Sequence, residues 1–238
     1  EAFMRDHILP MAAAVWSTPS RKVGDFPLSS FLMFCRNHGL LQIGDRPNWA
    51  TIPGGSKEYI RALTDNTRAK FYKNTPVLGL RRIAGKVSVR THQAPEHVYD
   101  RVLVATHANT ALKLMVDADP LEKDILGAFR YAKNRAVLHS DENFMPKAKR
   151  AWSSWNYMQS DSSNSDSLSV TYWMNKLQPL KTSTNLFVTL NPEHEPGKSH
   201  IHYIKDYEHP IFDLSTLEAQ QRQMEIMGHR NIWYAGAH

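Results

Sequence analysis

Two small groups of residues have types and spacings that suit chemistry. Cys35 lies near His38, which suits a thiolate–imidazole pair, although a single Cys within an apolar helix more often packs in a core. Alternation along a strand would place His200 and His202 on one face, as a pair of metal ligands. No carboxylate or further histidine completes a known pattern, so surface histidines are favoured and no metal is expected.

A third group is aromatic and suits binding. Five aromatic residues are concentrated in a strand-rich stretch: Trp152, Trp155, Tyr157, Tyr172 and Trp173. Trp155 and Tyr157 share one face of a strand, and Tyr172 shares a face with Met174. Trp155, Tyr157 and Tyr172 are therefore candidates for the wall of an apolar substrate pocket. Packing between a sheet and a helix is the alternative.

Motifs and charge exclude several classes of protein. The sequence has no GxGxxG, GxxxxGK[ST], GxSxG or CxxC, which leaves P-loop, hydrolase-elbow and thiol-redox chemistry without support. The net charge of +6 is spread along the chain, and its densest cluster, Lys147–Arg150, is typical of a solvated loop. We therefore expect no nucleic-acid partner.

Cysteine content and hydropathy bear on the compartment. Cys35 is the single cysteine, so an internal disulfide is excluded and a reducing, cytoplasmic location is favoured. No apolar run approaches the roughly 20 residues that span a bilayer. We expect no transmembrane segment, and peripheral membrane contact stays open.

The elements that must position these residues begin with helices. Apolar spacing predicts a helix over 3–16 and a second one from Pro27 that stops at Gly39. A third helix follows Gly54-Gly55-Ser56, with Ser56 as its N-cap. Glycines there allow a neighbour to approach the backbone closely, and an anion would fit at the helix start.

Period-two patterns dominate the rest of the chain. They predict a strand at 77–80, a hairpin over 82–90 that turns at Gly85-Lys86, and a strand at 102–105 that is buried on both faces. Helices are expected at 111–114, 121–131 and 215–227, and strands at 136–139, 152–158, 169–174, 186–190 and 202–207. The chain closes on an apolar strand, Ile232–Tyr234, followed by the small residues Ala235-Gly236-Ala237, where a ligand can approach the backbone.

Several segments, in this order, resemble the flavin-containing amine oxidase superfamily, most closely its branch of predicted NAD/FAD-binding proteins. The matching segments are 10–17, 37–41, 46–49, 54–59, 99–107, 136–141, 152–157, 207–212 and 233–237. They span nearly the whole chain. The resemblance implies that a nucleotide-binding fingerprint precedes Glu1 and that a flavin-contacting helix follows His238, so we expect a fragment that is inactive alone.

The resemblance also implies the fold class, which is α/β with an α+β substrate part. A partial Rossmann-like FAD/NAD(P)-binding domain would be interleaved with a substrate domain made of a mixed sheet and helices. On this basis 1–48 would be the helical part of the substrate domain and 111–213 its sheet-rich part. Residues 49–110 and 214–238 would belong to the FAD-binding domain.

The cofactor implied is FAD. By resemblance its contacts would include Val77, Thr106, Gly236 and Ala237, with Gly54 and Gly55 in the segment that returns toward the flavin. Many amine oxidases of the superfamily place a Lys near the flavin, whereas here Asn134 falls nearest that position.

The function implied is hydride transfer to FAD from an apolar substrate, and members of the branch suggest an acyl lipid. Two alternatives remain open. One is a flavoprotein-derived binding or accessory domain without activity, and the other is a true amine oxidase. The sequence names neither the catalytic residues nor the oligomeric state.

Overall fold

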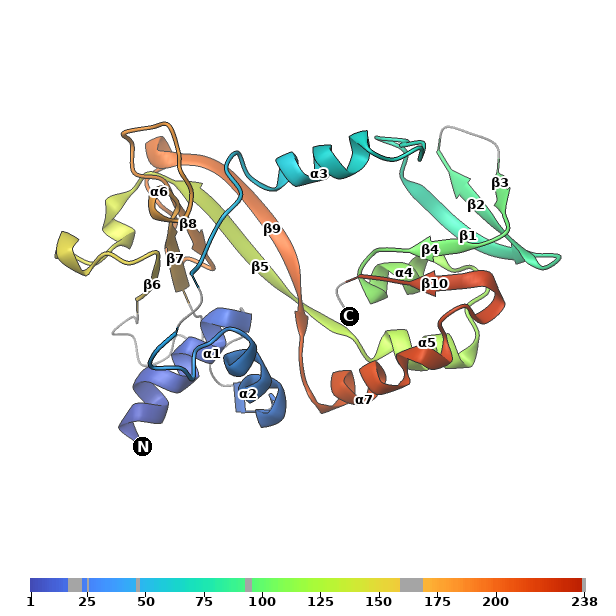
Figure 1. Ribbon diagram of the computed structural model, residues 1–238, viewed down its shortest axis with the longest axis horizontal. Coiled ribbons are helices and arrows are strands. Elements are labelled where there is room, and N and C mark those ends of the chain that lie inside the picture. Colours follow the sequence, from blue (N-terminus) through green and yellow to red (C-terminus); the bar gives the residue numbers. More distant parts are fainter. Residues whose placement is uncertain (17–22, 25, 46–47, 93–95, 159–168, 237–238) are drawn as a thin grey trace. The chain divides into compact units, whose positions relative to one another are not determined.

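The computed structural model describes residues 1–16, 23–24, 26–45, 48–92, 96–158 and 169–236 (Figure 1). The chain divides into two compact units. The first unit comprises Glu1–Ala69 and Ala132–His209, and the second unit comprises Lys70–Tyr131 and Pro210–His238. Each unit is therefore built from two separate stretches of sequence.

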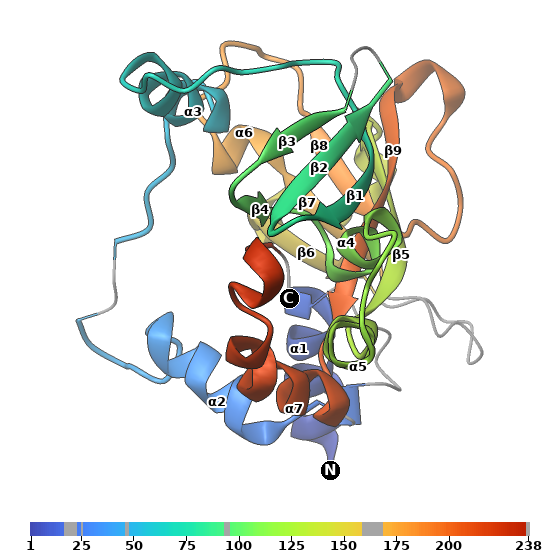
Figure 2. The ribbon, with the colours of Figure 1, turned by 90° about the vertical axis from the view of Figure 1, so that its right-hand side faces the viewer.

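The described residues of the second unit form two small sheets and three α-helices. Strands β1 (Val77–Ile83), β2 (Lys86–Thr91) and β3 (His97–Tyr99) form an antiparallel sheet in the order β1-β2-β3 (Figure 2). Strands β4 (Val102–Val104) and β10 (Ile232–Tyr234) form a parallel pair. The helices are α4 (Ala108–Leu114), α5 (Pro120–Gly127) and α7 (Leu214–Arg222). Helices α5 and α7 lie side by side, joined by an ion pair of 2.7 Å between Arg222 and Asp124 (Figure 1).

One apolar core holds the second unit together. Its buried members come from both stretches of the unit: Leu80, Val87, Val104, Ala108, Ala111, Met115, Ile125, Leu126, Phe129, Ala219, Ile226, Ile232 and Tyr234. Because α4 and α5 bury their apolar residues in this core, the unit extends to Tyr131.

The borders between the units differ from those expected from the sequence. The expected borders followed residues 48, 110 and 213, whereas those of the structure follow Ala69, Tyr131 and His209. The segment 111–131 groups with the second unit because its helices bury apolar residues in that unit's core, and 49–69 groups with the first unit. Periodicity marks these segments as helices but does not tell which core their apolar faces enter.

Local chemistry explains several element ends in the second unit. Ala84 and Gly85 both have positive φ, 47° and 74°, which is the backbone of the tight turn that joins twisted antiparallel strands. Helix α5 begins with a capping box. The side chain of Asp119 accepts a hydrogen bond from the backbone N–H of Glu122, and the side chain of Glu122 accepts one from the backbone N–H of Asp119. Pro120 occupies the first turn of α5, where no intrahelical donor is needed.

The first unit combines three helices near the N-terminus with a larger sheet. The helices are α1 (Leu9–Trp16), which continues a π-helical turn at Met4–Ile8, α2 (Leu28–Asn37) and α3 (Ser56–Asp65). The sheet has the order β6-β7-β8-β5-β9. Its strands are β5 (Arg130–His139), β6 (Trp155–Met158), β7 (Ser169–Trp173), β8 (Phe187–Leu190) and β9 (Ile201–Ile211), and a short helix α6 (Met174–Leu177) follows β7.

Most expected elements are confirmed, including both N-terminal helices and the terminal strand. Gly39 has a φ of 65° just after α2, as expected for a residue that ends a helix. Within the described ranges no helix is long and apolar enough to cross a bilayer.

Three local expectations are wrong. The helix expected over 121–131 ends at Gly127, and strand β5 begins at Arg130. The N-cap of α3 is Gly55, with a φ of 87°, and Ser56 is the first helical residue. The glycine takes the cap because the turn requires a positive φ that Ser adopts only with strain. Strand β4 is not buried on both faces, since Leu103 is 61% exposed. Only β10 pairs with β4 among the described residues.

Candidate functional site

The parallel pair β4–β10 brings two predicted cofactor residues to one edge of the second unit. Ile232 pairs with Val102 and Tyr234 with Val104, and the N–H of Ala235 donates to the carbonyl of Val104 at 3.0 Å. The carboxyl ends of parallel strands meet at the same edge, so Thr106 and Gly236 both follow this edge. Ala237 lies outside the described residues.

This edge consists of small side chains and exposed backbone. Ala105, Ala235 and Gly236 are exposed, and Thr106 is half-buried. The Thr106 hydroxyl donates to the carbonyl of His107 at 3.1 Å. Because the side chains at this edge are small, a planar or phosphate-bearing ligand can reach the backbone.

The other predicted cofactor residues belong to other elements. Val77 begins β1 in the three-stranded sheet and pairs with Thr91. Gly54 and Gly55 belong to the first unit, in a turn closed by a 2.9 Å bond from the Gly55 N–H to the carbonyl of Ile52. Both have positive φ, 84° and 87°, so the turn itself accounts for these glycines.

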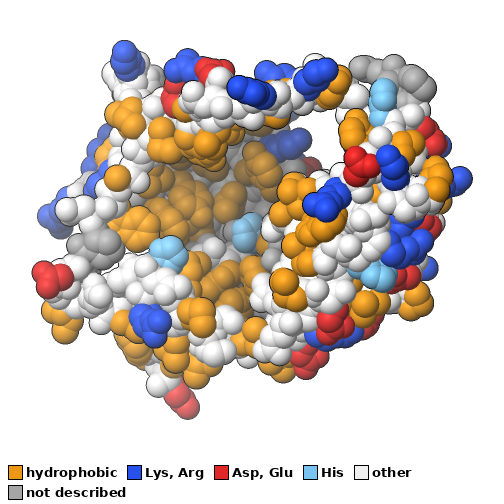
Figure 3. All heavy atoms as spheres, turned by 45° about the vertical axis from the view of Figure 1, so that its right-hand side comes forward, with side chains coloured by type: hydrophobic (Ala, Val, Ile, Leu, Met, Phe, Trp, Pro, Cys, Tyr) orange, Lys and Arg blue, Asp and Glu red, His pale blue; other side chains and the backbone are white. Residues whose placement is uncertain are grey.

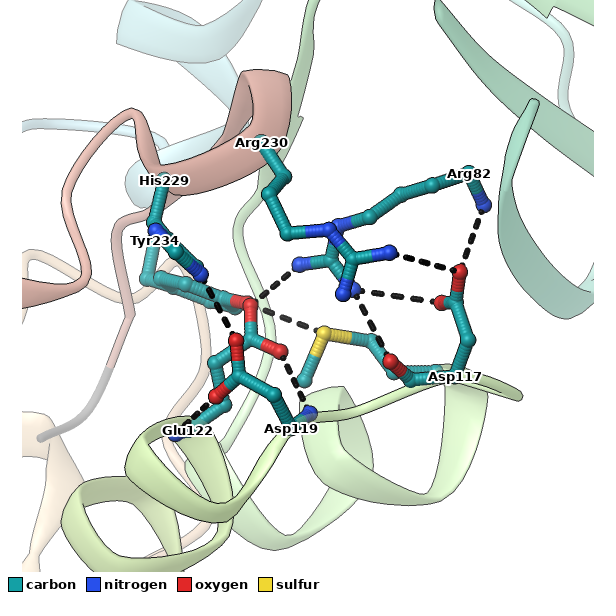
Figure 4. Close-up of polar contacts among 8 residues, drawn as sticks. Arg82, Asp117, Asp119, Glu122, His229, Arg230 and Tyr234 are labelled. Carbon is teal, nitrogen blue, oxygen red and sulfur yellow. Dashed lines mark hydrogen bonds and ion pairs between the residues drawn. The ribbon is translucent and has the colours of Figure 1, made fainter. Parts of the chain in front are cut away.

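A buried ionic network lies behind the edge (Figure 4). The Glu122 carboxylate is fully buried and accepts a 2.8 Å hydrogen bond from the hydroxyl of Tyr234, which is 1% exposed. The same carboxylate pairs with the guanidinium of Arg82, whose side chain is 6% exposed. The Tyr234 hydroxyl also lies 2.9 Å from the sulfur of Met115. One carboxylate thus connects β1, α5 and β10.

Two aspartates extend this network (Figure 4). The Asp117 carboxylate accepts the backbone N–H of Arg82 at 3.0 Å and its guanidinium at 3.1 Å. The Asp119 carboxylate lies 2.6 Å from Nε2 of His229, in the turn that precedes β10. Both ends of β10 are therefore connected to the start of α5 by polar side chains.

The network shifts the pKa values of its members. Burial raises the pKa of Tyr234 far above its usual range, and the neighbouring Glu122 carboxylate adds to the rise. Burial lowers the pKa of Arg82, but the charges of Glu122 and Asp117 outweigh that effect and raise it. The pKa of Asp119 is lowered, first by the backbone N–H of Glu122, with burial opposing and His229 contributing. The Tyr234 hydroxyl therefore stays protonated and the Arg82 guanidinium stays charged.

Two of the three predicted aromatic residues, Trp155 and Tyr157, line an apolar pocket in the first unit. The pocket has a volume of about 250 Å³ and is lined by His7, Pro10, Met11, Val15, Trp155, Tyr157 and Val170. Tyr172 stands next to it, with its ring centroid 5.3 Å from that of Trp155 in an edge-on contact, and packs against Ala13 and Val170. Figure 3 shows hydrophobic side chains gathered on the surface of this unit.

The remaining candidates do not form reactive sites. Cys35 is buried, which raises the pKa of its thiol and disfavours a thiolate nucleophile. The described residues contain no cluster of metal-ligating side chains. Asn134 is buried and bonded within the sheet, where its carbonyl accepts the Asn191 amide at 2.7 Å.

Sequence reasoning missed Arg82 and Glu122. Residues Asp119 to Glu122 carry the spacing of a capping box, which was a readable sign of a helix start. It did not show that Glu122 also meets two distant strands, because that contact depends on tertiary packing.

Comparison with known proteins places the chain in a family. The model of the flavin containing amine oxidoreductases matches residues 10–229, and the chain belongs to this family. The match confirms the family expected from the sequence, and the family's flavin agrees with the expected FAD. A search of curated proteins finds no match.

Solved structures show the same fold at low sequence identity. A proposed protoporphyrinogen oxidase from Exiguobacterium sp. 255-15 matches with a TM-score of 0.63 and 12% identity, covering 99% of this chain and 59% of that one. Reduced UDP-galactopyranose mutase matches with a TM-score of 0.58 and 12% identity, and the match covers 98% of this chain and 59% of the mutase chain. The CLA-producing fatty acid isomerase from P. acnes matches with a TM-score of 0.54 and 14% identity, covering 87% and 50%.

These likenesses confirm the expected α/β fold class of amine-oxidase-like flavoproteins. The chain spans between half and three fifths of the length of these three proteins.

Proposed function

We propose that this chain is part of an FAD-dependent oxidoreductase and that the edge formed by β4 and β10 contributes to the FAD site. The observation that carries the proposal is the parallel pair whose carboxyl ends lead into Thr106 on one strand and Ala235-Gly236 on the other. Thr106, Gly236 and Ala237 would contact the cofactor directly, and the backbone of Val77 would contribute from β1. Gly54 and Gly55 would add the turn of the first unit.

The residues present fit such a cofactor. A dinucleotide needs close approach to backbone at the carboxyl edge of parallel strands, and the side chains here are small and solvent-accessible. FAD supplies the redox chemistry by accepting a hydride from a substrate carbon. The protein's part is to hold the reactants in position and to exclude water.

The substrate we propose is apolar, and an acyl lipid is the class favoured. The pocket walled by Trp155 and Tyr157, with Tyr172 behind it, presents hydrocarbon and aromatic surface with little polar lining. One of the structural neighbours is a fatty acid isomerase, which supports the same class. Many amine oxidases of the superfamily place a Lys near the flavin, and Asn134 in that position favours this substrate over an amine.

An FAD titration tests the cofactor proposal. We expect the purified chain to quench flavin fluorescence with saturation and to give a protein-bound flavin spectrum. Gly236→Leu places a bulky side chain at the edge and should weaken FAD binding by at least about tenfold. Gly127→Leu adds the same side chain at another glycine of the second unit, where a Cβ meets open space, and should bind as the wild type does. A folded chain that leaves flavin fluorescence unchanged contradicts the proposal.

Activity measured on the full-length protein separates the alternatives. Hydrogen peroxide release with a panel of amines would indicate a true amine oxidase. Reduction of bound flavin by an acyl lipid supports the proposed substrate. A full-length protein that binds FAD and acyl lipid without reducing the flavin would be a binding protein.

A further inference from the structure

The Glu122 carboxylate makes contacts in three directions from a fully buried position. One oxygen, Oε1, accepts the Tyr234 hydroxyl at 2.8 Å and pairs with Arg82. The other, Oε2, accepts the backbone N–H of Asp119 at 3.1 Å. Glu122 therefore fixes a side chain of β10 relative to the beginning of α5 and to β1.

Stability alone does not account for this arrangement. A buried ion pair costs desolvation energy, and well-packed apolar side chains often replace one without loss of stability. What a satisfied buried network adds is a single defined geometry. Here the geometry defined is that of Tyr234, because its hydroxyl contacts both Glu122 and the Met115 sulfur.

Strand β10 needs a contact that fixes its position. It is three residues long and, within the described part of the chain, has β4 as its single partner strand. The residue after Tyr234 is Ala235, whose N–H donates the last bond of the ladder, to the Val104 carbonyl. A displacement of Tyr234 would therefore be passed directly to Ala235 and Gly236.

We propose that the hydrogen bond from Tyr234 to Glu122 holds the Ala235–Gly236 turn in place. Tyr234 and Glu122 are then positioning residues for the flavin. The flavin part of this inference rests on the proposed function. The positioning of the turn does not, since it depends on contacts within the second unit.

Amide hydrogen exchange tests the positioning without any cofactor. Tyr234→Phe removes one hydroxyl and keeps the ring, and it should speed exchange of the Ala235 amide about tenfold relative to the amides of β1 and β2. Val87→Ala perturbs the same core from β2 and serves as the stability control, in which all these amides should change together. If the Ala235 amide in Tyr234→Phe changes only as β1 and β2 do, the proposal is overturned.

A second variant separates the hydrogen bond from the charges. Arg82→Met combined with Glu122→Gln removes both charges and keeps an oxygen acceptor for the Tyr234 hydroxyl. Protection of the Ala235 amide should stay within about twofold of wild type, relative to β1 and β2. Loss of that protection in the folded double variant would show that the charges, not the hydrogen bond, hold the turn.

FAD affinity tests the link to the cofactor. The dissociation constant for FAD should rise about three- to tenfold in Tyr234→Phe and stay unchanged in Val87→Ala. Equal affinities in wild type and Tyr234→Phe would refute the flavin part. A wild-type chain that does not bind FAD refutes the proposed function instead, and the exchange experiment still decides whether the turn is positioned.

Discussion

Single side chains in the first unit also show how burial fixes protonation. His139 on β5 is fully buried, and its Nε2 lies 2.7 Å from the Thr189 hydroxyl. Its Nδ1 accepts the backbone N–H of Asp141 at 3.1 Å, so the proton of the neutral ring is on Nε2. Burial lowers the pKa of His139 to about 4; Asp141 opposes this effect, and His202 and His200 add to it.

The lowered pKa predicts acid sensitivity. The pKa of His139 is 6.5 in the unfolded chain and about 4 in the folded chain, so the unfolded chain takes up the proton first as the pH falls. The free energy of unfolding is therefore highest above about pH 6.5 and decreases as the pH falls toward 4. We expect the wild type to lose about 3 kcal/mol of unfolding free energy over this range through His139. Urea unfolding of His139→Gln should lack that part of the pH dependence. His97→Gln, at an exposed position on β3, should retain it; equal pH profiles for wild type and His139→Gln would contradict the assignment.

At the scale of elements, the start of α7 depends on one carboxylate. The Asp213 side chain, 12% exposed, accepts the Ser215 hydroxyl at 2.6 Å and the Thr216 N–H at 3.0 Å, and it pairs with Arg130. Burial raises the pKa of Asp213, but these hydrogen bonds and the Arg130 charge outweigh it and lower the pKa to about 2.

This cap predicts a second acid transition. Stability from Asp213 is complete above about pH 4 and is lost as the pH falls toward 2, because the folded carboxyl keeps its charge longer than the unfolded one. Asp213→Asn should cost about 2 kcal/mol at pH 7 and almost nothing at pH 2, as measured by thermal or urea unfolding. Asp206→Asn removes an exposed carboxylate from β9 and should change stability by less than about 0.5 kcal/mol at either pH. A deficit for Asp213→Asn that is equal at both pH values would rule out the proposed role of its charge.

The turn before β10 is another element-scale feature. Gly228 has a φ of 79°, and a Cβ there would stand 2.9 Å from the Trp233 ring. Gly85 has a φ of 74° in the β1–β2 turn with open space around it. Gly228→Ala should therefore destabilise the protein by about 1 kcal/mol more than Gly85→Ala, since both introduce strain and only the first adds a clash. If urea unfolding shows equal losses of unfolding free energy for the two variants, the Trp233 ring moves aside without cost.

Sequence patterns gave the elements more reliably than their assembly. The terminal strand and its small residues were readable, and so was the edge at Thr106, because they depend on local composition. Strand β4 was expected to be covered, yet Leu103 is exposed, since a run of apolar residues does not reveal how many neighbours a strand has. The contact of Glu122 with Arg82 and Tyr234 was not readable, because the three residues are distant in sequence.

At the scale of the whole molecule, the two units have separate cores. The core of the second unit draws on residues of that unit alone. We therefore predict that 70–131 joined to 210–238 by a short Gly-Ser linker folds by itself. Circular dichroism should show a cooperative thermal transition. In the same linked chain, Leu126→Ala should lower the melting temperature by about 10 °C or more, because a fully buried leucine side chain is lost. Absence of any cooperative transition in the linked chain without this substitution would contradict the prediction.

The pairing of β4 with β10 also has a consequence during synthesis. The two strands come from opposite halves of the sequence. A ribosome that has made β4 must therefore complete the entire five-stranded sheet before it delivers β10. Until then β4 lacks its partner and Glu122 lacks the Tyr234 hydroxyl, so the nascent chain displays an unpaired apolar edge for seconds. This interval is when a chaperone would be most needed. A premature stop within it would leave the core of the second unit without Ala219, Ile226, Ile232 and Tyr234.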